Sequence, residues 1–186
     1  MVIIFSAPSG SGKSTIINYL LQQNLPLQFA ISATSRAPRG NEKDGVEYYF
    51  LSPQVFKKKI KNGEFAEYEE VYKDMFYGTL KSEIERIQLS GNHVICDVDV
   101  AGGRRIKESY AEKALSIFIL PPSIDALHKR LITRGTDSPE MIESRLSKAQ
   151  YELEFVPEFD MVIINDVLEK AQAETLKVVQ QFITSN

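Results

Sequence analysis

Residues 2–15 read VIIFSAPSGSGKST, and this stretch decides the fold. Its apolar beginning, residues 2–5, predicts a buried strand, and the apolar-periodic run after Lys13 predicts a helix. Between them lies a turn rich in glycine and serine, whose backbone can curl around an anion because glycine has no Cβ. The start of a helix presents free N–H groups and the positive end of the helix dipole. The order of strand, turn and helix therefore predicts a phosphate-binding loop.

The side chains of this loop indicate a nucleoside triphosphate. Lys13 would reach the outer phosphates, and the Ser14 hydroxyl would coordinate the Mg²⁺ that bridges those phosphates. The usual pattern, G-x-x-x-x-G-K-[ST], has a glycine where this chain has Ala7, a small departure because the turn needs only room there. A chance Gly/Ser loop is the alternative, which the ordered strand, loop and helix disfavour. The residues expected to hold the nucleoside triphosphate here are Ala7, Pro8, Ser9, Gly10, Ser11, Gly12, Lys13, Ser14 and Thr15.

Length and composition set the limits of what the protein can be. The 186 residues fit one domain, or a core with a small insertion. The 22 basic and 25 acidic residues leave a net charge of −3, which argues against a general nucleic-acid binder. No apolar run approaches the roughly 18 residues of a membrane span, and no signal peptide is visible. The single cysteine, Cys96, is expected to pack in a reduced, cytoplasmic protein. We expect small-molecule substrates, with neither nucleic acid nor membrane as a partner, and the sequence leaves the choice between monomer and homo-oligomer open.

The hydrophobic pattern predicts an α/β fold. Residues 2–5, 94–98, 115–120 and 161–164 are nearly continuous apolar runs, which indicates strands buried on both faces. Helical patterns follow them, as in a parallel sheet covered by helices. Ser123 is expected to cap a helix over residues 124–131, and Asp166 with Glu169 resembles a capping box for the last helix. The prediction is a P-loop parallel-sheet core flanked by helices.

Residues 27–90 interrupt this pattern and predict an inserted α+β subdomain, with four glycines and most of the tyrosines. Ser52-Pro53 is a good helix start and Gly63 a good stop, so a short helix is expected over residues 54–62. Val55, Phe56 and Ile60 are expected to face inward. The lysines at 57, 58, 59 and 61 then form a solvated face rather than an anion site.

Two arginines suggest a second phosphate site. Arg36 and Arg39 flank Pro38 in the stretch 32–40, SATSRAPRG. Guanidinium forks bind phosphate oxygens bidentately, so the pair suits a phosphate separate from the loop. A structural ion pair is the alternative for either arginine. Tyr48 can add a hydroxyl to the same anion, whereas Tyr49 would face the other side of a strand and pack.

Two carboxylates stand where the strand of residues 94–98 ends. Asp97 and Asp99 are two residues apart, so they share a face of the strand, and open α/β sheets bind ligands at the carboxyl ends of their strands. Both side chains are therefore expected to point at the site. The alternative, two helix-capping aspartates, fits Asp97 less well because Asp97 interrupts an apolar strand.

Taken together, the motifs of the chain resemble those of guanylate kinase over nearly the whole length. They are, in order, SAPSGSGKST, SRAPRG, GVEYYF, FAEY, YGT, DVDVAG, RLITRG and IIND. The resemblance implies phosphoryl transfer from ATP to GMP, and to dGMP, giving ADP and GDP in purine nucleotide recycling. It also implies a GMP-binding insertion over residues 32–90 and a helical lid over residues 126–154, around a core of residues 1–31, 91–125 and 155–186.

The resemblance assigns residues to the acceptor nucleotide. Guanine offers two neighbouring donors, N1–H and the 2-amino group, and an ionised carboxylate accepts both. The resemblance places Glu67 in this role, with Ser32 and Thr79 as hydroxyl donors to guanine O6. Adenine lacks the donor pair and would leave the carboxylate unpaired. The implied GMP-binding residues are Ser32, Arg36, Arg39, Tyr48, Glu67, Tyr77, Thr79 and Asp99.

The same resemblance assigns the residues of the transfer itself. It places Lys13, Arg134 and Arg145 on the phosphates, and Asp97 where it organises the magnesium shell or a nearby arginine. It also places Arg130 and Asn165 near ATP, with Asn165 beside the adenine, although Asn165-Asp166 would serve equally well as helix caps.

Two other functions fit the sequence less well. A P-loop kinase of another acceptor, such as a ribose bisphosphate, has no need of a guanine reader. A binding module of the same fold has no need of Lys13 or of the lid arginines.

Overall fold

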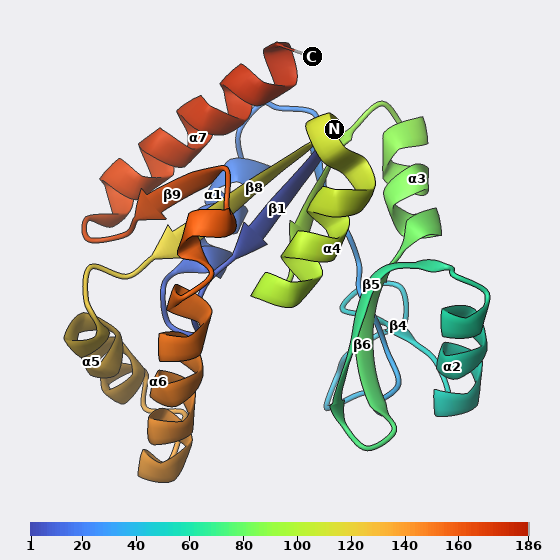
Figure 1. The fold of residues 1–186 in the computed structure, drawn as a ribbon, viewed down its shortest axis with the longest axis horizontal. Helices are drawn as coiled ribbons and strands as arrows, with labels where there is room; N and C mark the ends of the chain where they lie inside the picture. Colours follow the sequence, from blue (N-terminus) through green and yellow to red (C-terminus); the bar gives the residue numbers. More distant parts are fainter. Residues whose placement is uncertain (186) are drawn as a thin grey trace.

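The computed structural model describes residues 1–185, and its core is a five-stranded parallel sheet. The strands lie in the order β2-β7-β1-β8-β9, so the strand that leads into the glycine loop is central (Figure 1). All four predicted strands are confirmed. The fifth, β2, lies at an edge and is too short to be recognised from its pattern. The strands span β1 Val2–Ser6, β2 Leu27–Phe29, β7 His93–Asp97, β8 Ala114–Leu120 and β9 Met161–Ile164.

Helices cover both faces of this sheet. Successive side chains of β1 point to opposite faces, so they enter two apolar clusters, one on each side of the sheet. Ile3 and Phe5 pack with α1 (Lys13–Leu21) and α7 (Leu168–Thr184) on one face. Val2 and Ile4 pack on the other face with Ile84 of α3 (Lys81–Leu89) and with α4 (Val100–Tyr110). Cys96 is buried in this second cluster and forms no disulfide. The core sheet is thus held between two layers of helices, as predicted for an α/β fold.

A second, smaller sheet stands beside the core (Figure 1). Its four strands follow the order β4-β3-β6-β5, and α2 packs on it through the stacked rings of Phe56 and Phe65, with centroids 4.3 Å apart. Ser52 caps α2 as predicted, by accepting a hydrogen bond from the Val55 N–H at 3.2 Å. The elements are β3 Ala33–Thr34, β4 Tyr49–Phe50, α2 Pro53–Lys61, β5 Phe65–Tyr72 and β6 Met75–Leu80.

One side chain of α2 departs from the expectation. Val55 does not face inward. It is 44% exposed, because only Phe56 and Ile60 reach the cluster under the small sheet. The lysines do form a solvated face: Lys57 pairs with Asp74, and the Lys59 ammonium lies 2.6 Å from the Glu64 carboxylate.

Two helices, α5 (Ile124–Arg134) and α6 (Pro139–Leu153), project from the core on the side away from the small sheet (Figure 1). They pack on each other through a cluster of their own that contains Leu127, Leu131 and Ile142. Ser123 caps α5 as predicted, and Gly135 ends it with a φ of 67°. The two remaining elements are short 3₁₀ helices, η1 Ala111–Lys113 and η2 Val156–Glu158.

The predicted capping box of the last helix is wrong. The helix α7 begins at Leu168, its N-cap is Val167, and no side chain caps it. Asn165 and Asp166 lie before this turn. The Asn165 N–H donates to the Leu120 carbonyl at 2.8 Å, which keeps the chain beside β8 and carries the Asn165 side chain into the interior. Within residues 1–185, no helix has the length and apolarity needed to cross a membrane.

Candidate active site

The glycine loop between β1 and α1 has the backbone of an anion cradle. Gly10 and Gly12 have φ angles of 94° and 90°, which lie in the left-handed region where glycine is favoured. No side chain caps the start of α1, and its first turn carries no acidic residue. The first N–H groups of α1 and the positive end of its dipole are therefore available to a phosphate.

Lys13 and Asp97 form an ion pair at the mouth of this loop. The pairing of β1 with β7 places Phe5 opposite Asp97, which brings the end of β7 next to the root of the loop. Asp97 therefore contacts a lysine, where the family pattern suggested an arginine or the magnesium shell. Because an ammonium group has three donors, Lys13 can keep its ion pair with Asp97 and still donate a hydrogen bond to a phosphate.

Asn165 and Arg130 tie the loop to the carboxyl end of the sheet. The Asn165 amide donates to the Ser11 carbonyl at 2.7 Å, and Arg130 donates to the Asn165 carbonyl at 2.8 Å. A Cβ added to Gly12 would overlap the Asn165 amide nitrogen, so the loop fits only with glycine at that position. Asn165 thus supports the loop and caps no helix.

Arg145 of α6 reaches across to the loop. Its Nη1 donates to the Ser9 hydroxyl at 2.7 Å, and its Nη2 lies 3.1 Å from the Asp137 carboxylate. Four buried polar side-chain atoms lack a partner within residues 1–185, and all four belong to this region: Ser11 Oγ, Asn165 Oδ1, Arg145 Nε and Asp137 Oδ2. Buried polar groups are rarely left unpaired, so their gathering around one loop indicates a polar ligand site.

Arg134 is not brought into this region. It is the last residue of α5 and is exposed, and its side chain makes no hydrogen bond or ion pair with any other described residue. The cleft between the loop and α6 has a volume of about 600 Å³. Its lining includes Ser9, Lys13, Tyr48, Asp97, Asp99 and Arg145.

On the far wall of the cleft, Glu67 presents a buried carboxylate. It is 7% exposed, and the Thr79 hydroxyl donates to its Oε1 at 2.7 Å. The pKa of Glu67 is raised to about 7, mainly by burial and to a smaller extent by the negative charge of Asp99, while the Thr79 hydrogen bond lowers it. Ser32, Tyr48, Tyr77 and Asp99 line the same pocket of about 160 Å³. The predicted GMP-site residues on the small sheet are thus brought together.

Arg36 lies beside this pocket, held by several groups. Its guanidinium makes two contacts with Glu42, at 2.6 and 2.8 Å, and its Nε donates to the Tyr77 hydroxyl at 3.1 Å. It also stands 4.9 Å from the centre of the Tyr48 ring. The ion-pair alternative therefore holds for Arg36, with an acid that the sequence reasoning did not single out. Arg39 is exposed, and its backbone N–H donates to Glu42 at 2.8 Å.

Asp99 and Tyr49 have structural contacts of their own. Asp99 caps α4 by accepting a hydrogen bond from the Gly102 N–H at 2.7 Å. The capping alternative is thus confirmed for Asp99, although its carboxylate also lines the cleft. Tyr49 packs away from the pocket, as expected, and donates to Glu83 at 2.9 Å.

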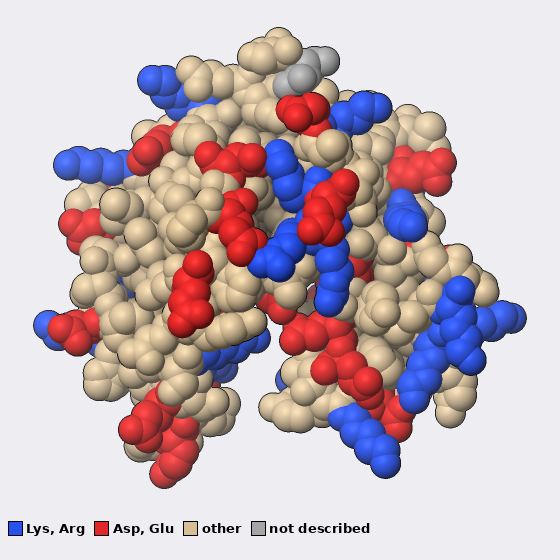
Figure 2. All heavy atoms as spheres, in the orientation of Figure 1, with Lys and Arg blue, Asp and Glu red and all other residues tan. Residues whose placement is uncertain are grey.

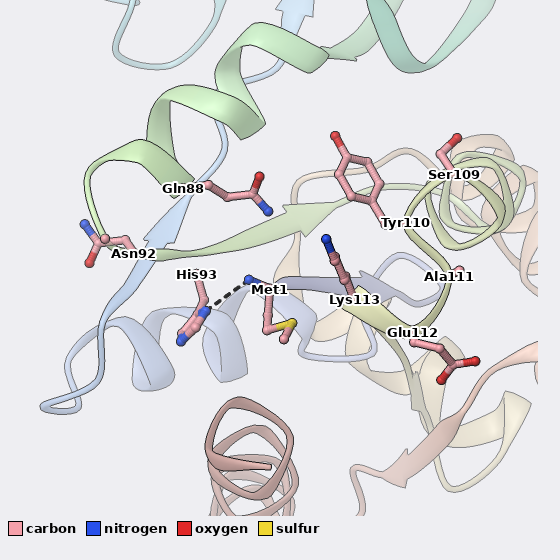
Figure 3. A pocket seen from close by; sticks show the side chains of 10 residues that line it. Met1, Gln88, Asn92, His93, Ser109, Tyr110, Ala111, Glu112 and Lys113 are labelled. Atoms are coloured by element: carbon pink, nitrogen blue, oxygen red, sulfur yellow. Dashed lines mark hydrogen bonds between the residues drawn. The ribbon is translucent and has the colours of Figure 1, made fainter. Parts of the chain in front are cut away.

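A larger hollow lies at the opposite end of the sheet (Figure 3). Its volume is about 770 Å³, and it opens where β1, β7 and β8 begin. The Met1 amino group donates to His93 Nδ1 at 3.1 Å, and Lys113 points into the hollow beside them (Figure 3). Ligands of open α/β sheets bind at the carboxyl ends of the strands, so the cleft at the glycine loop is the candidate active site.

Comparison with known proteins agrees with this geometry. The sequence model of the family described as guanylate kinase matches residues 1–185. The chain belongs to the guanylate kinase family. It is therefore a nucleotide-binding transferase, an ATP:GMP phosphotransferase.

Relatives at high identity carry the same family name. A guanylate kinase of Bacteroides fragilis is 66% identical over 182 residues, covering 98% of this chain and 89% of the relative. A guanylate kinase of Porphyromonas gingivalis is 55% identical over 183 residues, covering 98% and 97%. A crystal structure of guanylate kinase from Anaplasma phagocytophilum matches with a TM-score of 0.75 and 29% identity, covering 97% of this chain and 85% of that one.

Sequence reasoning missed Glu42, which holds Arg36 beside the guanylate kinase cleft, and three residues that line the cleft: Glu69, Lys148 and Glu152. For the last two a signal was present. Arg145, Lys148 and Glu152 are spaced three and four residues apart, which places them on one face of a helix. Glu69 shares a strand face with Glu67, because side chains two residues apart on a strand point to the same side. Glu42 gave no such signal, because its contact with Arg36 depends on the path of a loop.

Proposed function

We propose that this chain transfers the γ-phosphoryl group of ATP to GMP, and also to dGMP, in cytoplasmic purine nucleotide recycling. One observation carries the assignment of sites. The glycine loop with Lys13 and the buried Glu67–Thr79 pair stand on opposite walls of one cleft, as a donor and an acceptor nucleotide require. Figure 2 shows the molecule notched between the lobe of α5 and α6 and the lobe of the small sheet.

The proposed acceptor site reads guanine through hydrogen bonds. Ionised Glu67 accepts from N1–H and the 2-amino group, while the hydroxyls of Ser32 and Thr79 donate to O6. Arg36, Arg39, Tyr48 and Tyr77 bind the GMP phosphate, and Asp99 contacts the nucleoside. In this division the small sheet, within residues 32–90, is the GMP-binding part, and residues 126–154 are the lid.

The proposed donor site holds the triphosphate on the loop, residues 7–15, with Arg130 and Asn165 on the side of the adenine. A phosphate oxygen of GMP attacks the γ-phosphorus, and the bond from that phosphorus to the β–γ bridging oxygen breaks, which releases ADP. Negative charge spreads over the equatorial oxygens during transfer, so positioning and positive charge suffice and no covalent nucleophile is needed. Lys13 and Arg145 supply that charge, and Arg134 joins them when the lid closes.

The residues present fit a magnesium ion bound together with ATP. Ser14 is exposed at the start of α1, next to Lys13, and would hold the ion through its hydroxyl. Residues 1–185 contain no cluster of three His, Cys, Asp or Glu side chains suited to a metal, which fits an ion that takes most of its ligands from phosphate and water. When bound, Mg²⁺ neutralises the charge on the β- and γ-phosphates.

A coupled assay of ADP release tests the proposal. With ATP as the donor, GMP, dGMP, AMP, UMP and CMP are offered in turn at equal concentration. We expect turnover with GMP and slower turnover with dGMP, and at most about 1% of the GMP rate with the others, because none of those bases offers the two neighbouring donors that Glu67 accepts. Equal rates with AMP and GMP would contradict the assignment of Glu67, and turnover without a nucleoside monophosphate would contradict the acceptor site.

A further inference from the structure

Glu69 lies on the acceptor wall of the cleft, two residues along β5 from Glu67, the residue proposed to bind guanine. In the antiparallel ladder of β5 and β6, Glu67 faces Thr79 and Glu69 faces Tyr77. Side chains two residues apart on a strand share a face, so Glu67 and Glu69 point to the same side of the sheet. Both of them line the pocket of about 160 Å³, together with Asp99.

The two cross-strand residue pairs, or rungs, of this ladder face different parts of the acceptor nucleotide. The Glu67–Thr79 rung carries the proposed base reader, and the Tyr77 hydroxyl of the next rung holds Arg36, the proposed phosphate ligand. Two residues of a strand advance by about 6.6 Å. The ribose joins the base to the phosphate, so it runs along this wall from the Glu67–Thr79 rung to the next rung, where Glu69 faces Tyr77.

The charge around Glu69 decides which part of the nucleotide it can contact. The neighbouring carboxyl group of Asp99 raises the pKa of Glu69, and partial burial adds to this rise, while the charges of Lys148 and Arg105 lower the pKa. Among the described residues, Glu69 belongs to no ion pair of 4.0 Å or less. A pair of acidic groups repels a phosphate. It accepts hydrogen bonds from neutral hydroxyls, as carboxylates do with ribose in dinucleotide sites.

We propose that Glu69 accepts a hydrogen bond from a ribose hydroxyl of the acceptor nucleotide and makes the enzyme prefer GMP over its deoxy analogues. The inference rests on the proposed function, because it needs the base at Glu67 and the phosphate at Arg36. Glu69 becomes a specificity-determining residue that discriminates sugars, beside Glu67, which discriminates bases.

The test compares kcat/KM for GMP, dGMP and 3′-deoxy-GMP in the wild type, in Glu69→Ala and in Glu69→Gln. Removing a negative charge from the cleft alters the binding of every dianionic nucleotide alike, so that effect cancels in the ratio of GMP to a deoxy analogue. We expect the ratio for at least one analogue to fall about threefold to tenfold in Glu69→Ala, the loss of one hydrogen bond. Glu69→Gln keeps one acceptor oxygen and should lose less.

Glu70→Gln is the matched control. Glu70 is the next residue of β5, faces Phe76 across the ladder, and accepts a hydrogen bond from the Asp74 N–H at 2.8 Å in the turn. Its selectivity ratios should equal those of the wild type. Unchanged ratios for both analogues in Glu69→Ala and Glu69→Gln would overturn the inference, even if KM for all three nucleotides shifts together. A wild type that does not phosphorylate GMP at all would instead refute the proposed function.

Discussion

Arg36 and Glu42 form a two-point ion pair next to the acceptor pocket, with nitrogen–oxygen distances of 2.6 and 2.8 Å. The Arg36 side chain is 7% exposed and also donates to the Tyr77 hydroxyl. The guanidinium beside it lowers the pKa of Glu42 to about 2. The pair therefore stays charged throughout the pH range in which the enzyme can be assayed, and it fixes the orientation of the arginine.

Glu42→Gln should raise KM for GMP about threefold to tenfold and leave KM for ATP unchanged, because a misoriented Arg36 loses part of a charge-assisted contact. Initial-rate kinetics with each substrate varied in turn measure both constants. Glu47→Gln is the control, because Glu47 lies in the same loop and its carboxylate accepts a hydrogen bond from the Lys43 N–H. A rise in KM for ATP alone would place Arg36 at the wrong nucleotide.

Glu67→Gln should stabilise the fold at pH 8 while it weakens GMP binding. The folded-state pKa of Glu67 is raised from 4.5 to about 7, so the stability linked to this proton is full below pH 4.5 and is lost as pH rises through 7. A neutral glutamine avoids that loss, which is at most about 3 kcal/mol. GMP affinity should fall by about 1.5–3 kcal/mol, since an amide NH₂ confronts a guanine donor. Thermal unfolding and calorimetry measure the two effects, and a variant that is less stable than the wild type at pH 8 would contradict the burial argument.

KM for GMP should rise as the pH falls from 8 to 6. Protonated Glu67 offers a donor where guanine also has one, and its pKa of about 7 places the change in this interval. The GMP phosphate also titrates, near pH 6. Glu67→Gln separates the two titrations, because the pH profile of KM in this variant reflects only the titration of the GMP phosphate. Identical pH profiles for the wild type and this variant would show that Glu67 does not titrate in the free enzyme.

Lys13→Ala should lower kcat at least about 100-fold and leave the fold intact, because Lys13 lies at the loop mouth and its loss removes charge stabilisation from the transferred phosphoryl group. Single-turnover rates measure the loss of phosphoryl transfer, and circular dichroism shows whether the fold is intact. Lys170→Ala, at an exposed position of α7, should behave as the wild type. Near-normal turnover of Lys13→Ala would refute the assignment of the loop.

Gly12→Ala should destabilise the protein more than Gly91→Ala. Both glycines have a φ in the left-handed region, 90° and 81°, so each alanine costs about 1–2 kcal/mol of backbone strain. Only at Gly12 does the added Cβ overlap another group, the Asn165 amide, because nothing lies within 4 Å at Gly91. Denaturant unfolding of both variants gives the difference, and Asn165→Ala in the Gly12→Ala background should recover part of it. Equal losses of unfolding free energy at the two positions would show that the Asn165 side chain moves away from the added Cβ without a cost in stability.

The sequence by itself determined the elements whose signals are local. The glycine loop, the four long parallel strands and the caps Ser52 and Ser123 follow from periodicity and from residue conformational preference over a few neighbours, and all of them are present. The motif pattern also predicted the family. Asp166 shows where this reasoning fails: a capping pattern existed, but Asn165 is still paired with Leu120 of β8, and the helix begins only at Leu168, with Val167 as its N-cap.

Only the tertiary structure decided which side chains meet. Glu42 contacts Arg36, Asn165 contacts Ser11, and Arg145 contacts Ser9 across 6, 154 and 136 positions of sequence. No local pattern encodes the last two contacts, because they join segments whose distance depends on how the sheet orders its strands. The same holds for the pKa of Glu67, which is raised by burial that the small sheet and α4 create together. Local residue preferences thus specify the elements, whereas the electrostatics of the site arise from their packing, since charge and solvation depend on distances in space.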